Sequence, residues 1–492
     1  MKRTGGILLH ITSLSSPYGV GNLGACARAF VDFLAEAGQR YWQILPIAPT
    51  GYGDSPYQAS STFAGNPYLI DPDALVSEGL LTKEELAVDW GKDPGQVDFG
   101  LLYEKRLPLL RKAFLRDDRK EALESFCKEQ SRWLEDYALF MAVKGRFGGA
   151  PWLSWDADIR LRKPAAMASY RRELAEEIDF QKWLQWRFYG QWQQLHDYAA
   201  QKGIAIIGDI PIYVPLDSCD VWAEPENFQL TRTRRPRVVA GCPPDGFSKA
   251  GQYWGNPIYD WHKMEKDGFV WWLRRIGAAV NFFDVVRIDH FRGVESYWSI
   301  PAHHKTARHG SWVKGPGMAL IDAIKEAYPK ARFIAEDLGF LTPEVHELVE
   351  QSGFPGMKVL EFAFDSREPS NYLPHFYGEN CVCYTGTHDN ATLRQWYEES
   401  DEDVLDRAYA RAYMELPEGA DFCEGIIRLG LASRADLFIC QMQDYLGLGA
   451  EARMNEPGTL KAQNWRWRMA ADAADEALAG KIKALAEAYG RA

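Results

Sequence analysis

The sequence predicts an α/β fold: a (β/α)8 TIM barrel with large, mainly helical and loop-rich insertions and no C-terminal β domain. Short apolar runs rich in β-branched and aromatic residues alternate with helical segments, a pattern typical of a parallel sheet. Several runs end in polar or charged residues, as barrel strands do where functional side chains collect. Eight such runs occur in the 492 residues, at 5–13, 41–47, 203–212, 281–293, 331–339, 357–364, 380–389 and 435–447.

The chain opens with a strand, a helix and a second strand. Residues 5–13 (GGILLHITS) and 41–47 (YWQILPI) have the composition of the two strands. Between them, residues 26–37 repeat apolar side chains with the period of an amphipathic helix, and Gly38 follows as a C-cap. His10, near the end of the first run, is either a pocket residue or a buried histidine of the core.

A long insertion follows this opening unit. Residues 48–72 are dense in Gly, Pro, Ser and Tyr, and a loop of this length in a compact domain is usually functional. Residues 101–202 are mostly helical by their apolar periodicity. Thr82 and Glu85 stand three residues apart, which predicts a capping box at the start of a further helix.

These segments divide the chain into a barrel and two insertions. We expect residues 1–49 and 203–492 to form the barrel. Residues 50–202 then form an insertion subdomain on its C-terminal rim, and residues 215–262 form a second, loop-rich insertion.

The run NFFDVVRIDHFRG (281–293) is predicted to be a buried strand that ends in charged residues. Its apolar residues are nearly continuous, as expected for a parallel strand covered on both faces. Side chains alternate along a strand, so Arg287 and Asp289 project to the same side, where the guanidinium favours the ionised carboxylate. A purely structural ion pair at a strand end explains these two residues alone equally well.

Three predicted strand ends carry a carboxylate, namely Asp289, Glu336 and Asp389. Neighbouring strands lie about 5 Å apart, so Asp289 and Glu336 can stand at the roughly 5 to 5.5 Å of a retaining glycosidase pair. Glu336 follows an apolar stretch whose burial raises the pKa of a carboxyl, as a general acid requires. We expect Asp289 to act as nucleophile, while Asp389 and His388 bind sugar hydroxyls.

Composition limits the class of protein. The net charge of −12 disfavours nucleic acid and anionic membranes as partners. The N-terminus lacks a secretory apolar region and no stretch is long enough to span a bilayer, so we expect a cytoplasmic protein. The 18 Trp and 23 Tyr residues are unusually many, and aromatic faces suit the C–H-rich faces of sugars.

Two other residue classes give weaker signals. The eight cysteines are spread out and no metal-binding motif occurs, so we expect free thiols and no metal or cofactor. A His/Asp metal hydrolase built on His290, His388 and Asp389 stays open, although these residues lack tight ligand spacing. The basic run 231–237 (TRTRRPR) is typical of a solvated loop.

Several motifs together resemble the amylomaltase family, the 4-α-glucanotransferases or disproportionating enzymes of the α-amylase-related clan. The resemblance spans essentially the whole chain, in order, and its combination of motifs is highly specific. The matching motifs are GYGDSPYQ, GNPYLID, GDIPIYV, VVAGCPPDGFS, GQYWGNPIYDW, VRIDHFRG, IAEDLG, GTHDN, RMNEPGT and NWRWR.

The resemblance implies a 4-α-glucanotransferase that moves α-1,4-glucan segments between maltooligosaccharides and releases glucose. It maps the nucleophile onto Asp289, the acid/base onto Glu336 and the third carboxylate onto Asp389. The loop that begins VVAGC matches a flexible lid, with Phe247 and Tyr253 as its lid residues. The matched substrate-binding residues are Tyr57, Asp209, Trp254, Arg287, His290, His388 and Asn464.

Two alternatives stay open at this point. An α-amylase-like retaining glucan hydrolase would use the same three carboxylates. A catalytically inactive glucan-binding protein would share the fold, although the intact Asp289, Glu336 and Asp389 argue against it.

Overall fold

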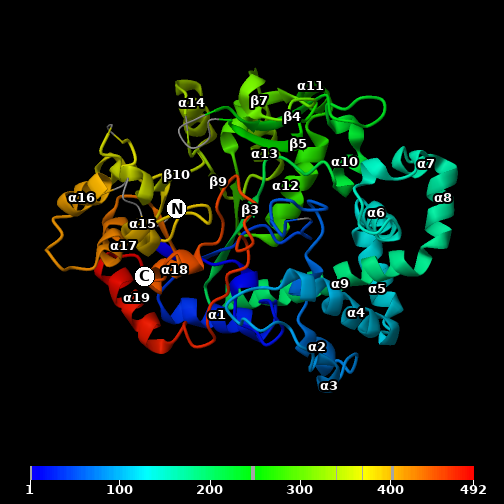
Figure 1. Cartoon of the computed structure of the whole chain (residues 1–492), viewed down its shortest axis with the longest axis horizontal. Coiled ribbons are helices and arrows are strands. Elements are labelled where there is room, and N and C mark those ends of the chain that lie inside the picture. Colours follow the sequence, from blue (N-terminus) through cyan, green and yellow to red (C-terminus); the bar gives the residue numbers. More distant parts are fainter. Residues whose placement is uncertain (1–2, 52, 245–249, 340, 368–369, 400–403) are drawn as a thin grey trace.

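Eight parallel strands close into a barrel in the order β1-β12-β11-β10-β9-β6-β3-β2 (Figure 1). The computed structural model describes the chain except residues 1–2, 52, 245–249, 340, 368–369 and 400–403. The predicted (β/α)8 barrel is confirmed, and each predicted strand run contains or overlaps one barrel strand. The strands are β1 (Thr4–Leu8), β2 (Tyr41–Gln43), β3 (Ala205–Ile210), β6 (Val285–Ile288), β9 (Phe333–Ala335), β10 (Gly356–Val359), β11 (Cys381–Tyr384) and β12 (Leu437–Gln441).

Strand β6 is shorter than the sequence predicts. All four of its residues are buried, as expected for a strand enclosed by the barrel interior and outer helices. The prediction that the strand begins near residue 281 is wrong, because helix α12 (Val270–Phe282) runs through Phe282. Asp289 follows the last residue of β6 directly, so the charged residues lie at the C-terminal end of the strand, as predicted.

Helices surround the barrel in the βα pattern. Gly38 has a φ of +66° just after α1, which a glycine adopts without strain. No described helix has the length and apolar character needed to cross a membrane. Besides α12, the helices around the barrel are α1 (Ala25–Glu36), α13 (Met318–Ala327), α14 (Pro343–Ser352), α15 (Leu393–Glu399), α16 (Val404–Tyr413), α17 (Phe422–Ala432), α18 (Met442–Tyr445) and α19 (Glu476–Ala488).

The chain between β2 and β3 is mainly helical and lies to one side of the barrel (Figure 1). The predicted capping box is confirmed, since Thr82 and Glu85 each accept from the other's backbone N–H. The helices are α2 (Pro72–Ser77), α3 (Lys83–Leu86), α4 (Phe99–Arg116), α5 (Lys120–Glu129), α6 (Leu134–Arg146), α7 (Ala157–Arg160), α8 (Pro164–Glu173) and α9 (Ala175–Gln201).

A second sheet, which the sequence analysis did not predict, has four antiparallel strands in the order β5-β4-β7-β8. Its first two strands come from the segment expected to be loop-rich, with the short helices α10 (Cys219–Ala223) and α11 (Trp261–Lys266) on either side. Its other two strands follow β6, which places the sheet beside the C-terminal end of the barrel. The strands are β4 (Val238–Cys242), β5 (Gln252–Pro257), β7 (Ser296–Pro301) and β8 (Ser311–Lys314).

Candidate active site

Arg287 lies at the centre of a cluster of carboxylates inside the C-terminal end of the barrel. The strand register places it opposite Asp209 of β3. Its Nη1 donates to Asp209 Oδ2 at 2.6 Å and to Asp289 Oδ1 at 3.0 Å. Arg287 and Asp209 are buried, and this burial raises the pKa of Asp209 although Arg287 opposes the rise. The predicted alternation of Arg287 and Asp289 is therefore present as a direct contact.

Glu336 stands at the same level as Asp289 on the neighbouring strand. The register pairs Ile288 with Ala335, so the next residue of each chain segment is one of the two carboxylates. The backbone N–H of His290 donates to Glu336 Oε2 at 2.6 Å, and that of Leu338 donates to Oε1 at 2.8 Å. These bonds hold the Glu336 carboxyl against the residue that follows Asp289.

Burial raises the pKa of Glu336 from 4.5 to about 8. Arg287 and the two backbone donors favour the ionised form, whereas the nearby negative charge of Asp289 adds to the rise. Desolvation outweighs the favourable contacts because Glu336 is buried. A carboxyl with this pKa carries its proton at neutral pH.

His290 turns the chain at the end of β6. Its φ of +50° is in the left-handed region, which is uncommon for a residue with a side chain. Burial lowers the pKa of His290 to about 4, so its imidazole is neutral at pH 7. The Trp254 ring of β5 meets the His290 ring edge to face, with centroids 4.8 Å apart. The antiparallel sheet thus contributes an aromatic wall beside Asp289.

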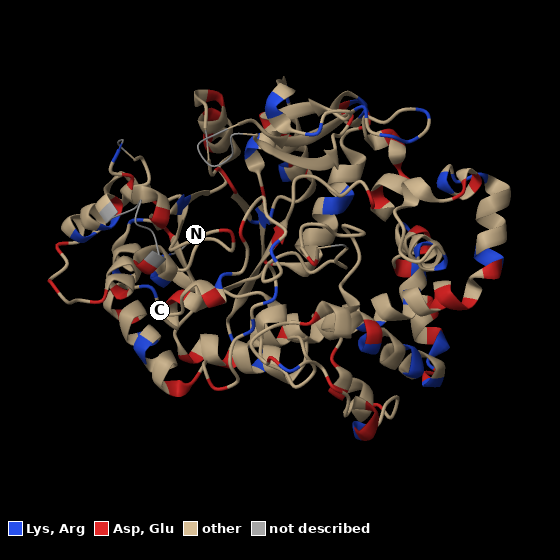
Figure 2. Cartoon of the chain, in the orientation of Figure 1, with Lys and Arg blue, Asp and Glu red and all other residues tan. Residues whose placement is uncertain are grey.

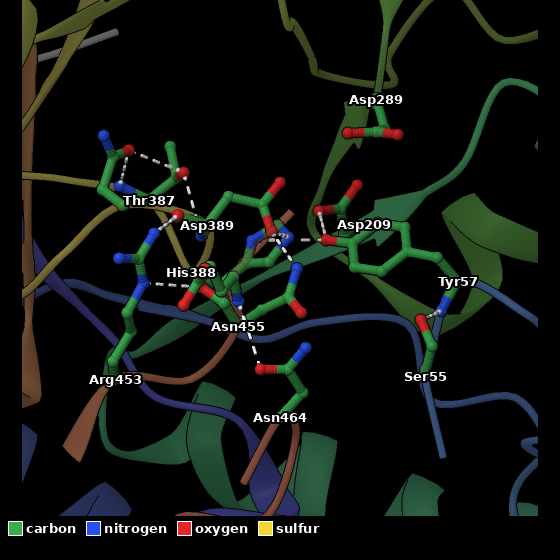
Figure 3. Close-up of polar contacts among 12 residues, drawn as sticks. Ser55, Tyr57, Asp209, Asp289, Thr387, His388, Asp389, Arg453, Asn455 and Asn464 are labelled. Atoms are coloured by element: carbon green, nitrogen blue, oxygen red, sulfur yellow. Dashed lines mark hydrogen bonds and ion pairs between the residues drawn. The ribbon is translucent and has the colours of Figure 1, made fainter. Parts of the chain in front are cut away.

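Asp389 belongs to the loop after β11 and is held by a loop near the C-terminus (Figure 3). Asn455 Nδ2 donates to Asp389 Oδ1 at 2.6 Å, and His388 Nε2 lies 3.3 Å from the same oxygen. Arg453 Nη2 donates to the Asp389 backbone carbonyl at 2.8 Å. The side chain of Asp389 is 44% exposed, so it faces open space where a ligand can reach it.

Tyr57 joins the two halves of the cluster. Its hydroxyl donates to Asp209 Oδ2 at 2.8 Å and lies 3.4 Å from His388 Nδ1 (Figure 3). Its ring stacks on the His388 ring at 5.0 Å, and the Trp465 ring lies within 6 Å of both. The long loop that carries Tyr57 is thereby tied to the ends of β3 and β11.

Sequence reasoning assigned no role to Asn455, Arg453 or Trp465. The first two belong to the RMNEPGT motif, which contributed to the resemblance, but nothing in their spacing indicated Asp389 as their partner. Trp465 has a φ of +69°, a strained conformation for a bulky residue, and the Tyr57 and His388 rings pack against it.

Three predicted site residues lie apart from this cluster or outside the described chain. Asn464 uses both ends of its amide within its own loop, accepting from the Glu456 N–H and donating to Thr459. Tyr253 is 40% exposed and, as the neighbour of Trp254 on β5, projects to the opposite face of the sheet. Phe247 lies outside the described residues.

His10 is buried and also lines a small cavity together with Met454 and Trp465. Its Nδ1 accepts from the Leu45 N–H at 3.3 Å, and burial, with a smaller contribution from His388, lowers its pKa to about 3. The structure therefore contains features of both interpretations of His10. In the part of the chain that the structure describes, no group of three or more His, Cys, Asp or Glu residues is placed to hold a metal ion.

Tyr57, Asp209 and Arg275 of α12 line a cavity of about 60 Å³. Arg275 is buried, and its guanidinium donates to Thr62 Oγ1 at 2.9 Å, to the Ile212 carbonyl at 2.9 Å and to the Tyr259 hydroxyl at 3.1 Å. These three segments follow Tyr57, Asp209 and Trp254 in the chain. One guanidinium therefore connects three segments of the site, through one backbone carbonyl and two side-chain hydroxyls.

Comparison with known proteins agrees with this architecture. A family model described as 4-alpha-glucanotransferase matches residues 9–473. A 4-alpha-glucanotransferase of Clostridium butyricum is 47% identical over 487 residues, which cover 98% of this chain and 100% of that protein. One of Thermus thermophilus is 47% identical over 502 residues, covering 100% and 99%.

Solved structures give the same result. The amylomaltase from Streptococcus agalactiae in complex with acarbose is 43% identical, with a TM-score of 0.97 and full coverage of both chains. The amylomaltase from Corynebacterium glutamicum, at 19% identity, shares the fold with a TM-score of 0.78, over 98% of this chain and 73% of that one. From the family match over residues 9–473 and these relatives, the chain belongs to the 4-alpha-glucanotransferase family and is an enzyme of that activity.

Proposed function

We propose that this enzyme moves α-1,4-glucan segments between maltooligosaccharides by a retaining double displacement through a glucosyl ester of Asp289. One observation carries the proposal: Asp289 and Glu336 occupy equivalent positions on adjacent strands, one beside a guanidinium and the other with its pKa raised to about 8. Such a pair supplies the anionic nucleophile and the neutral acid that retention requires.

In the first step, an Asp289 oxygen attacks the anomeric carbon of the donor. The C1–O bond of the glycosidic link breaks, and the Glu336 proton moves to the departing oxygen. When the bond to the reducing-end residue of the donor breaks, the leaving group is glucose. Glu336 is then ionised, and the charge of Arg287 partly offsets the negative charge that the cluster retains.

In the second step, the 4-hydroxyl of an acceptor glucan attacks the same carbon. Its proton moves to Glu336, the ester bond to Asp289 breaks, and both carboxyls return to their starting states. Retention follows because the anomeric carbon is inverted twice.

The remaining polar groups of the cluster would bind and distort the sugar at the reacting carbon. Asp389 is exposed, and Asn455 and His388 occupy one of its oxygens, which leaves Oδ2 for sugar hydroxyls and for the oxocarbenium-like transition state. Among the described residues Asp209 Oδ1 has no hydrogen-bond partner, and this buried oxygen would accept from a sugar hydroxyl. Tyr57, Trp254, Arg287 and His290 would form the walls of this subsite, and Asn464 would shape the loop beside it.

The balance between transfer and hydrolysis depends on which nucleophile reaches the glucosyl ester. A lid that excludes water and positions a sugar hydroxyl favours transfer. Phe247 and Tyr253, on the segment that precedes and enters β5, are the proposed lid residues. A Phe247→Ala variant is expected to hydrolyse a larger share of its product than wild type, and an unchanged ratio argues against the lid.

Incubation with maltotriose tests the proposed function. Transfer produces glucose together with a ladder of longer maltooligosaccharides on thin-layer chromatography. An α-amylase-like hydrolase would give only shorter products, and that result would overturn the proposal. Replacement of Asp289 by Asn is expected to abolish both outcomes.

A further inference from the structure

The antiparallel sheet and its loops differ sharply in charge from the rest of the chain. Residues 227–259 and 296–317, which form this sheet, contain eight Lys and Arg residues but only one Asp and no Glu. The sheet segments therefore carry a net charge of +7 and the remaining residues −19. Figure 2 colours the protruding loop beside α11 blue. Such segregation creates a local positive potential on an acidic protein.

The hairpin at residues 231–235 holds much of this charge without ion-pair partners. Arg232, Arg235 and Arg237 are exposed and Arg234 is half-buried, and none of the four forms an ion pair with a described residue. The turn itself is ordered: Thr231 N–H donates to the Arg235 carbonyl at 2.8 Å. The guanidinium groups thus extend from a fixed backbone with their donors available.

A second basic loop adjoins this hairpin. The Ala302 N–H donates to the Arg237 carbonyl at 3.1 Å, which brings the β7–β8 loop alongside. Residues 296–317 contain no Asp or Glu, and Lys305 is exposed without an ion-pair partner among the described residues. We call Arg232, Arg234, Arg235, Arg237 and Lys305 the basic surface.

The same sheet also presents an aromatic surface and reaches the active site. Trp312 of the edge strand β8 is 42% exposed, and the Arg292 guanidinium lies 3.9 Å from its ring centroid. At the opposite edge, Trp254 of β5 contacts His290. The Ala307 N–H donates to Ala250 at 3.2 Å, so the basic β7–β8 loop also contacts the segment that enters β5.

We propose that the basic surface binds phosphate monoesters carried on an α-glucan and so recruits phosphate-bearing donor chains. Guanidinium groups bind phosphate oxygens in pairs, and exposed aromatic rings pack on sugar faces. A nucleic acid is charged along its whole length, so the part beyond the basic surface would be repelled by the acidic remainder of the molecule. A glucan with few phosphates is mostly neutral, so it avoids this repulsion while a phosphate group binds the basic surface. This inference rests on the proposed transfer between glucans.

Transfer assays on matched donors test the proposal. Amylodextrin carrying phosphate monoesters and the same material after phosphatase treatment serve as donors for wild type and for an R232S/R235S variant. We expect the variant to raise KM about fivefold for the phosphorylated donor alone, from two lost exposed charge contacts. The wild-type preference for phosphorylated donor is expected to fall as NaCl rises from 50 to 500 mM.

An R171S/R172S variant is the matched control, because it removes the same charge from the exposed surface of α8. It is expected to leave the preference unchanged. Equal KM values for both donors in wild type, or an equal effect of the control variant, would overturn the proposal. Loss of transfer on both donors would instead mark a failure of the proposed function.

Discussion

Glu336 combines two opposing influences, and the result sets its chemistry. Two backbone N–H groups and a nearby guanidinium favour its anion, yet burial dominates and raises its pKa to about 8. The proton-donating form is required for the first step of the reaction. We therefore expect kcat/KM for maltotriose to fall above about pH 8, as Glu336 loses its proton in the free enzyme. A profile flat to pH 10 would contradict this assignment.

The same pKa predicts how stability depends on pH. The unfolded chain loses the Glu336 proton near pH 4.5, whereas the folded chain keeps it to about pH 8. The folded state binds more protons in this window, so its stability falls as pH rises from 4.5 to 8, by on the order of 3–4 kcal/mol. A Glu336→Gln variant should show a flatter decline of urea midpoint over this window. Parallel curves for variant and wild type would refute the shift.

At the residue scale, the catalytic carboxylates were easier to predict than the residues that hold the site in place. Asp289 and Glu336 follow strands with strong apolar signals, so their register could be foreseen from the pattern alone. Asn455 reaches Asp389 from 66 residues away, and no local pattern records such a contact. Trp465 adopts a left-handed backbone that its residue type disfavours, and only the rings packed around it explain this.

At the scale of elements, the barrel strands were predictable because each is a short apolar run buried on both faces. The end of α12 was not, because Phe282 and Phe283 continue the same apolar run from helix towards strand, and periodicity cannot divide so short a stretch. The antiparallel sheet was missed because β5 lies among glycines and prolines and β4 pairs with β7, which begins more than 50 residues later.

Arg275 of α12 contacts three segments that line the active site, and its replacement should affect substrate binding more than folding. Lysine keeps the charge but cannot reach Thr62, Ile212 and Tyr259 together. We expect Arg275→Lys to raise KM for maltotriose roughly tenfold while kcat changes about threefold or less, since misplaced walls weaken the positioning of the sugar.

Arg106→Lys is the control for this experiment. Arg106 is equally buried, but it donates to the Tyr68 carbonyl, at 3.1 Å, away from the active-site carboxylates. Steady-state kinetics of both variants decide the matter. Equal changes in KM would show that Arg275 acts only through general stability.

At the scale of the whole molecule, the barrel closes where β1 pairs with β12, and Arg491 bonds to residues on both sides of this junction. Arg491 is fully buried, and its guanidinium donates to the Leu431, Ser433 and Ala435 carbonyls at 2.7 to 2.9 Å and to the Thr4 carbonyl at 3.0 Å. Replacement by Ala removes these four hydrogen bonds and the buried guanidinium, although Arg3 still donates to the Leu431 and Ser433 carbonyls, and should cost about 3 kcal/mol.

The urea midpoint of Arg491→Ala measures this loss. Arg434→Ala is the comparison, because Arg434 lies in the same region and its ion pair with Glu379, at 3.6 Å, is exposed. Its midpoint should shift by less than the equivalent of about 0.5 kcal/mol. Equal urea midpoints for the two variants would show that the β1–β12 junction does not depend on Arg491.

The central claim is that Asp289 forms a covalent bond to the donor sugar. Maltotriosyl fluoride reacts without acid assistance, so a Glu336→Gln variant can form the ester but deglycosylates slowly. Mass spectrometry of a rapid peptic digest should then find one maltotriosyl unit on the peptide that contains residues 285–290. An adduct on Asp389, or no adduct while fluoride is released, would contradict the account.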